Sequence, residues 1–198
     1  MLQRVFVDAD VLASRTPYDW LALLRDETDA FQLHSSPAVV TDAVRLWRSR
    51  DPAAREAAIP RRLALVTASL DEVLGGAEGV PTSPPDAAGA SRGASGGGGP
   101  AAPGVDGPQG GCAVADARTT GAHVVVSSSA VPGADGDGLP FEICTPDDFL
   151  CLTDDATPDA VRAVARQRAG EPLAAALAAA GCPAFAERVT SHLRAISR

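Results

Sequence analysis

The stretch that decides the fold is "VFVDADVL", residues 5 to 12. Three apolar residues run directly into two aspartates, Asp8 and Asp10, and apolar residues then resume. Residues 3 to 8, rich in Val and Phe, predict a short buried strand. An ionised Asp at the end of such a strand is costly to bury without a partner. Asp8 therefore either sits in solvent or on a helix cap, or lines a cleft and holds a cation.

Strands and helices alternate along the rest of the chain. Further short strands are expected at 31–35, 122–126 and 141–144. Four helices are expected where a capping residue precedes a proline suited to the first turn: at Thr16-Pro17, at Ser36-Pro37 up to about Trp47, at Asp51-Pro52 up to about Leu74, and at Thr145-Pro146. A helix from residue 112 that stops at Gly121, and a helical tail near 158–168, 171–180 and 184–196, complete the pattern. This order predicts an α/β fold with a central parallel sheet and C-terminal helices.

Residues 75 to 111 differ from the rest of the chain in composition and in hydrophobic pattern. They contain "GVPTSPPDAAGASRGASGGGGPAAPGVDGPQGG", which has no periodicity and almost no large apolar residue. Such a segment cannot bury enough surface to offset its ordering entropy, so we expect it to be disordered. The strand and helix pattern resumes in the same style afterwards. The segment is therefore interpreted as an insertion within one domain.

Charge argues mildly against a nonspecific binder of polyanions, because the net charge is -8 and nucleic-acid binders usually carry a basic footprint. All 17 basic residues are Arg. Six of them lie in "RLWRSRDPAAREAAIPRR", residues 45 to 62, against Asp51 and Glu56. This stretch either tracks a phosphate backbone or is a solvated helix face, and both interpretations stay open.

The spacing of the cysteines and the length of the apolar runs bear on the expected cellular location. None of Cys112, Cys144, Cys151 and Cys182 forms a C-x-x-C pair, so buried, reduced thiols are expected rather than a zinc or redox site. The chain starts directly with a strand, so no signal peptide is expected. No apolar run approaches the ~20 residues of a membrane helix. The expected location is the cytoplasm.

Carboxylates are the candidate site residues. Ligands of an open parallel sheet bind outside the carboxyl ends of its strands, where Asp8 and Asp10 lie. Asp8 is the better candidate, because alternation then turns Val7 and Ala9 to the opposite side; Asp10 is expected to cap the loop. Asp42 lies in a mostly apolar helix. Two carboxylates that converge in a cleft suit a hard divalent cation.

Five segments in this order resemble a PIN domain: "VFVDADVL", "PYDWLALLRDE", "SSPAVVTDAVRLW", "TTGAHVVVSS" and "LPFEICTPDDFL". The resemblance is to the bacterial toxin-like members with extra C-terminal helices. It implies a three-layer α/β/α sandwich over residues 1–152, interrupted at about 75–111, and a helical extension over 153–198. It also implies an endoribonuclease that uses Mg²⁺ or Mn²⁺ to activate water, and an antitoxin protein as partner. A homodimer is considered as well.

The acidic residues of the family carry over in part. Asp8 matches the first acidic residue and Asp42 the second, which is usually Glu. The third normally lies where this chain has about Gly110, and Asp116 follows a turn and a half later on the same helix. The resemblance therefore assigns metal binding to Asp8 and Asp42, and a third carboxylate has to come from Asp116, Asp135 or Asp137.

A second motif of the family, T-x-N-x-x-D, matches here as Ser127, Ser129 and Pro132. Ser127 retains the hydroxyl, which makes Asp8, Asp42 and Ser127 the expected catalytic residues. The acidic residue of the motif is absent, although Asp135 and Asp137 lie nearby. These departures leave an alternative open: a catalytically inactive PIN-like module that binds a protein partner or RNA.

Overall fold

A five-stranded, all-parallel sheet forms the centre of the protein. The computed structural model describes residues 2–50, 58–73, 111–129, 138–168 and 172–196. The strands follow the order β3-β2-β1-β4-β5. Their bounds are Gln3–Val7 for β1, Phe31–Ser35 for β2, Glu72–Val73 for β3, Val124–Val126 for β4 and Glu142–Cys144 for β5. The predicted α/β fold with a parallel sheet is confirmed.

The central strand β1 is the most buried part of the sheet. It pairs with β2, where Val5 lies opposite Leu33, and with β4, where Val7 lies opposite Val126. Val5, Phe6 and Val7 are all fully buried. A parallel strand covered on both faces needs apolar side chains in both directions. The run that opens the sequence meets this requirement as far as Val7, and Asp8 is the first residue beyond it.

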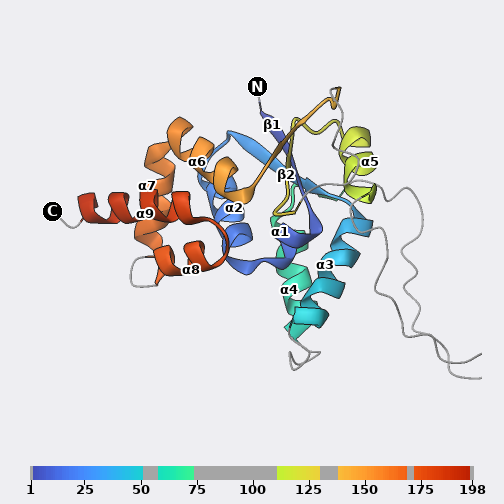
Figure 1. The fold of residues 1–198 in the computed structure, drawn as a ribbon, viewed down its shortest axis with the longest axis horizontal. Helices are drawn as coiled ribbons and strands as arrows, with labels where there is room; N and C mark the ends of the chain where they lie inside the picture. The colour runs from blue at the N-terminus through green and yellow to red at the C-terminus, as the bar shows by residue number, and fades with distance from the viewer. Residues whose placement is uncertain (1, 51–57, 74–110, 130–137, 169–171, 197–198) are drawn as a thin grey trace, which may run out of the picture.

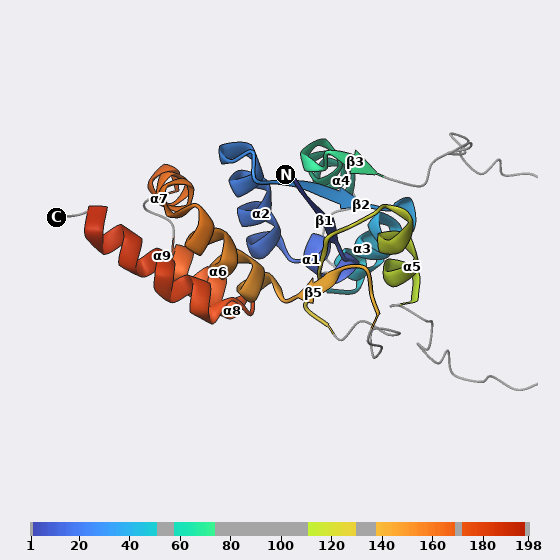
Figure 2. The same cartoon turned by 90° about the horizontal axis from the view of Figure 1, so that it is seen from above.

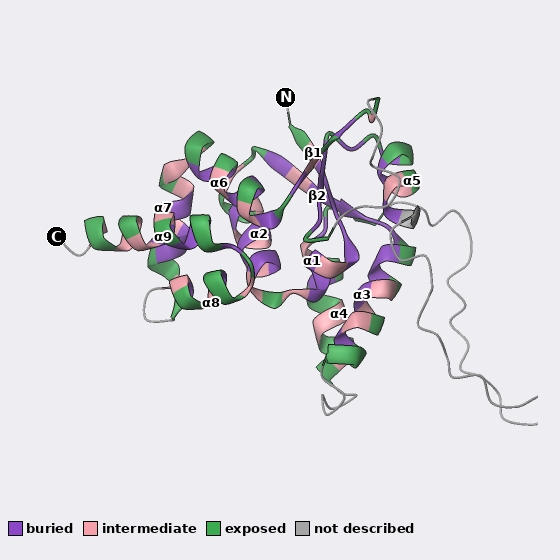
Figure 3. Cartoon of the chain, in the orientation of Figure 1, coloured by how far each residue is buried: buried purple, intermediate pink, exposed green. Residues whose placement is uncertain are grey.

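Nine helices lie within the described residues. Their bounds are Ala9–Ala13 for α1, Arg15–Glu27 for α2, Pro37–Arg50 for α3, Ala58–Ser69 for α4, Gly111–Thr119 for α5, Pro146–Ala156 for α6, Pro158–Gln167 for α7, Leu173–Ala179 for α8 and Pro183–Ile196 for α9. The helices α2 and α6 lie on one side of the sheet, and α3 and α5 on the other (Figures 1 and 2). The sheet between them is largely buried (Figure 3).

Three local predictions are wrong. The short helix α1 was not expected from the sequence; it begins where the Asp8 carboxylate accepts a hydrogen bond from the Ala9 amide. The next helix begins at Arg15 rather than after Thr16, with Ser14 at the N-cap. Pro17 still lies in the first turn, where no amide donor is needed.

The third error concerns the end of α4. We expected this helix to continue to about Leu74, but it ends at Ser69. Asp71 then binds Leu33 twice: its amide donates to the Leu33 carbonyl at 2.9 Å, and its carboxylate accepts from the Leu33 amide at 2.8 Å. These bonds draw the chain onto the edge of β2 and start β3.

Two further expectations concern parts of the chain that the structure does not describe. The expected helix start at Asp51-Pro52 lies outside the described residues. The expected insertion at 75–111 lies outside them as well, except for Gly111, where α5 begins.

The C-terminal helices pack on α2 and on the sheet. Phe149 of α6 meets Phe31 of β2 edge to face, with the ring centroids 5.3 Å apart. Phe185 of α9 meets Trp20 of α2 in the same way at 5.1 Å. Such pairs add to the free energy gained by burying the rings. The expected domain boundary after residue 152 lies inside α6.

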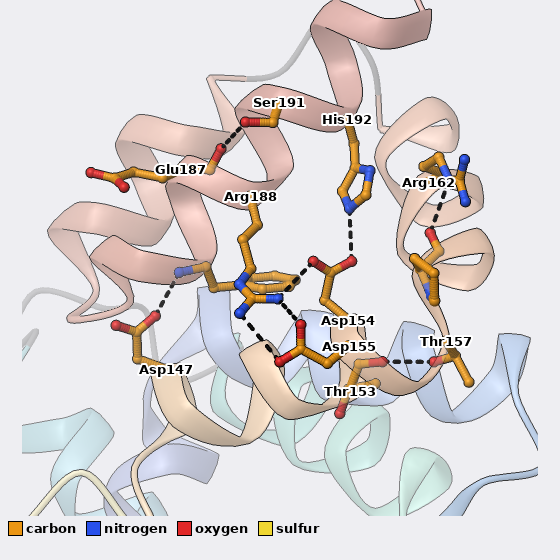
Figure 4. A network of polar contacts seen from close by, with 12 residues as sticks. Asp147, Thr153, Asp154, Asp155, Thr157, Arg162, Glu187, Arg188, Ser191 and His192 are labelled. Atoms are coloured by element: carbon orange, nitrogen blue, oxygen red, sulfur yellow. Dashed lines mark hydrogen bonds and ion pairs between the residues drawn. The ribbon is translucent and has the colours of Figure 1, made fainter.

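A polar network joins α6 to α9 (Figure 4). Asp154, which is 6% exposed, accepts hydrogen bonds from His192 Nε2 at 2.7 Å and from Arg188 at 3.3 Å. Arg188 also binds Asp155. Asp147 accepts from the amides of Ala184 and Phe185 at 3.1 and 2.8 Å, and so caps the start of α9. The negative charge of the buried Asp154 carboxylate is thus compensated by His192 and Arg188, which both belong to α9.

The structure agrees with the expected state of the thiols that it describes. Cys144, Cys151 and Cys182 are free, and Cys144 and Cys182 are buried. Among the described residues, no helix combines the length and the apolar character needed to cross a bilayer.

Candidate functional site

Asp8 lies at the carboxyl edge of the sheet, between the ends of β1 and β4. Its amide donates to the Val126 carbonyl at 3.0 Å, which extends the pairing of the two strands by one residue. One carboxylate oxygen, Oδ1, accepts from the Ala9 amide at 2.7 Å. The other, Oδ2, accepts from Ser127 Oγ at 2.9 Å. Two strand ends and the first turn of α1 therefore fix the side chain.

The surroundings of Asp8 disfavour its negative charge. The residue is only 8% exposed. Burial raises the pKa of Asp8 above its usual value of 3.8, and the nearby charges of Asp10 and Asp42 raise it further. The hydrogen bonds from Ala9 and Ser127 act in the opposite direction but do not outweigh burial. A cation bound at this edge would remove the penalty.

Asp10 lies near the same serine as Asp8, Ser127. Its Oδ2 accepts from the Ser128 amide at 3.0 Å, and Ser127 Oγ lies 3.5 Å away. Its Oδ1 is buried and has no hydrogen-bond partner among the described residues. A carboxylate oxygen without a hydrogen-bond donor, next to a second buried carboxylate, is available to coordinate a cation. Asp8 is the N-cap of α1, which was one of the alternatives left open, and Asp10 faces Ser127 and Ser128 from the first turn of α1 instead of capping the loop after β1.

Asp42 and Asp116 approach the same edge from other helices. Asp42, on α3, acts electrostatically on Asp8 but forms an ion pair with Arg45 at 2.5 Å. Asp116, on α5, accepts from Ser36 Oγ at 2.5 Å. Within the described part of the chain, no three His, Cys, Asp or Glu residues form a group that could hold a metal ion. Asp135 and Asp137 lie outside that part.

Serines mark the carboxyl ends of β2 and β4, the two strands that flank β1, and only some of them were singled out from the sequence. Ser35 Oγ donates to the Val7 carbonyl at 3.1 Å, and Ser36 holds Asp116. On the other side of β1, Ser127 and Ser128 bind the two aspartates. The signal was present in the sequence as "SS" at the end of one predicted strand and "SSS" directly after another.

The donor set suits Mg²⁺ or Mn²⁺ better than a softer ion. Mg²⁺ typically binds through one or two carboxylates and keeps several waters, so Asp8 and Asp10 fit it without a third acid. The buried Asp10 oxygen without a partner among the described residues supports this fit. Ser127 would hold both carboxylates in place.

Comparison of the chain with known proteins gave no matching protein family, no matching curated protein and no matching solved structure.

Proposed function

We propose that the protein is a Mg²⁺- or Mn²⁺-dependent endoribonuclease of the PIN type, with its site at Asp8. One observation carries this proposal: the buried Asp8 carboxylate, whose pKa is raised, lies beside an Asp10 oxygen that has no hydrogen-bond partner among the described residues, and the charge of Asp42 acts on it as well. The parallel α/β sheet and the ordered segments that resemble a PIN domain support the assignment of class.

The residues of the chain have separate tasks in this proposal. Asp8 and Asp10 would hold the ion, and Ser127 orients them through its hydroxyl. Asp42 adds negative charge to the same edge. A bound Mg²⁺ or Mn²⁺ supplies Lewis acidity and an activated water for attack on a phosphodiester.

The test is metal binding followed by RNA cleavage. Calorimetry with Mg²⁺ and Mn²⁺ should give millimolar or tighter binding to the wild type, roughly tenfold or more weaker in Asp8→Asn. The control is Asp159→Asn, because the Asp159 side chain is 94% exposed on α7 and pairs only with Arg162 among the described residues. A fluorescent single-stranded RNA should then be cut by the wild type and by the control, and not by Asp8→Asn. Absence of metal binding in the wild type would overturn the proposal.

Thermal unfolding in EDTA tests the electrostatics of Asp8 separately. The pKa of Asp8 is raised in the folded state, so ionisation costs stability as the pH rises through 3.8 toward the folded value. Asp8→Asn should therefore melt at a higher temperature than the wild type at pH 7, and this gain should vanish at a pH below 3.8. Added Mg²⁺ should raise the melting temperature of the wild type only.

A second candidate function is a PIN-like module that binds RNA without cutting it. The observation that favours it is the engagement of Asp42 by Arg45 and of Asp116 by Ser36. Metal binding without cleavage of RNA would support this function over the first.

A further inference from the structure

A groove of about 720 Å³ runs between α2 and α4. Its apolar lining includes Leu23, Leu65 and Val66. Leu65 is 65% exposed, the most exposed of the large apolar side chains that the structure describes. A cleft that combines an apolar lining with a few charged side chains is typical of a binding site.

Arginines dominate the charges of this groove. Among the described residues, the charged side chains that line it are Arg15, Arg61, Arg62, Arg168 and Asp19. These described residues carry a formal charge of +3, from four Arg and one Asp, on a chain whose net charge is -8. Positive charge concentrated against the overall balance indicates an anionic ligand.

Arg62 is held in place before any ligand arrives. Its guanidinium donates to the Ala13 carbonyl at 2.8 Å and lies 4.6 Å from the ring centre of Trp47. Burial lowers the pKa of Arg62, and although Asp19 opposes the shift, the charges of Arg15 and Arg50 add to it. An anion in the groove would relieve this crowding of like charges.

One end of α1 lies at the acidic edge, and the other end contacts Arg62 of the groove. This helix begins beside Asp8 and ends at Ala13, whose carbonyl accepts from both Arg62 and Trp47. Its five residues span about 7.5 Å at 1.5 Å per residue. A phosphate bound at Arg62 would therefore lie near one end of the short helix whose other end is at Asp8.

We propose that the groove between α2 and α4 binds the sugar–phosphate backbone of single-stranded RNA next to the acidic edge. The inference rests on the proposed function for the identity of the polymer. Guanidinium groups bind phosphate in a bidentate manner, and the apolar side chains of the lining offer contact to unstacked bases, which a duplex does not present. An acidic peptide is the competing ligand, and the charge alone would also suit it.

The experiment measures the fluorescence anisotropy of a fluorescein-labelled oligouridylate of about twelve nucleotides, within the range that one single-strand binding site covers. Binding is measured in EDTA, with the Asp8→Asn chain as the parent, so that no cleavage occurs. Arg15→Glu and Arg61→Glu reverse exposed charges of the groove and spare Arg62, which has structural contacts. Arg194→Glu, on the exposed side of α9, makes the same change of charge elsewhere.

Each groove variant should weaken RNA binding at least tenfold, and Arg194→Glu by less than twofold. The slope of log K against log salt should become shallower by about 0.7 for each phosphate that a variant no longer binds. Equal weakening by all three variants, or unchanged binding in the groove variants, would overturn the proposal. So would a heptaglutamate peptide that displaces the RNA at lower concentration than unlabelled oligouridylate does.

The two proposals can fail independently. RNA binding in EDTA does not need the metal, so a failed nuclease leaves a positive result in the groove intact. Conversely, metal binding at Asp8 can be measured by calorimetry whether or not Arg15 and Arg61 bind RNA.

Discussion

At the scale of single residues, two buried ionisable groups respond to pH in opposite ways. Burial raises the pKa of Asp8 and lowers the pKa of His34. Asp8 has hydrogen-bond partners for both of its oxygens. His34 is 3% exposed, and neither ring nitrogen has a hydrogen-bond partner among the described residues. Glu72 Oε2 lies 3.7 Å from His34 Nδ1, too far for a hydrogen bond, and burial together with the charge of Arg4 outweighs the charges of Glu72 and Asp71.

His34 should make the fold sensitive to mild acid. Its pKa in the folded state lies below the ordinary value of 6.5, so the unfolded state takes up the proton first as the pH falls. The wild type should lose stability from about pH 6.5 downward until the folded pKa is passed. His34→Leu should show less of this loss when urea unfolding is followed across that range of pH. The exposed His123→Gln variant should retain it, and identical pH profiles for the wild type and His34→Leu would contradict the assignment.

Only part of the candidate site could be located from the sequence. Asp8 was found from the sequence because an acid directly after a buried strand is conspicuous. The position of Asp10 was missed, because its direction depends on α1, a single short helix without a strong apolar period. The bond between Ser36 and Asp116 joins residues 80 positions apart, and no local pattern encodes it.

At the scale of elements, capping decided which boundaries could be predicted. Thr145 accepts from the Asp148 amide at 3.1 Å and Pro146 follows it, so this start was predicted correctly. Gly121, with φ of 63°, ends the turn after α5 as expected. The end of α4 was not foreseen, because Asp71 is held by β2 rather than by its sequence neighbours.

The cap of α9 is supplied by another helix, and its removal should be measurable. Asp147→Ala removes the acceptor for two amides at the start of α9. We expect a decrease of about 1 kcal/mol in the free energy of unfolding, as for other N-cap deletions. Asp159→Ala changes an Asp that is 94% exposed and should shift the free energy by less than about 0.5 kcal/mol. Urea titrations monitored by circular dichroism would compare the two, and equal effects would show that the cap contributes nothing.

At the scale of the whole molecule, the C-terminal helices share the core of the sheet. Buried residues from β1 to Val189 of α9 form one hydrophobic cluster. Sequence pattern predicted the helices of the tail, but not the ring pairs that attach them, because Phe31 and Phe149, or Trp20 and Phe185, lie far apart in the chain. The described part of the chain should therefore unfold as one unit.

Phe185→Ala tests whether the C-terminal helices and the sheet depend on one another for stability. The substitution removes a fully buried ring that packs on Trp20. A decrease of about 3–5 kcal/mol in the free energy of unfolding is expected from the cavity that it leaves. Leu152→Ala, on an exposed position of α6, is the control and should have a much smaller effect.

Cooperative unfolding of the wild type is measured with two probes. Tryptophan fluorescence and far-ultraviolet circular dichroism should give coincident unfolding curves. A fluorescence change that precedes the change in circular dichroism would show that the tail unfolds separately.

The order of the sheet also determines when the site can exist during biosynthesis. Asp8 and its partner Ser127 are separated by 119 positions, although they touch in the folded protein. At a translation rate of ~5–20 residues per second, ribosomes need about 6–24 s to make that interval. Until β4 emerges, one edge of the central strand stays unpaired, and such an edge invites association with other chains. A nascent chain therefore lacks its complete carboxyl edge throughout this interval, and chaperones that cover the open strand would matter most at that time.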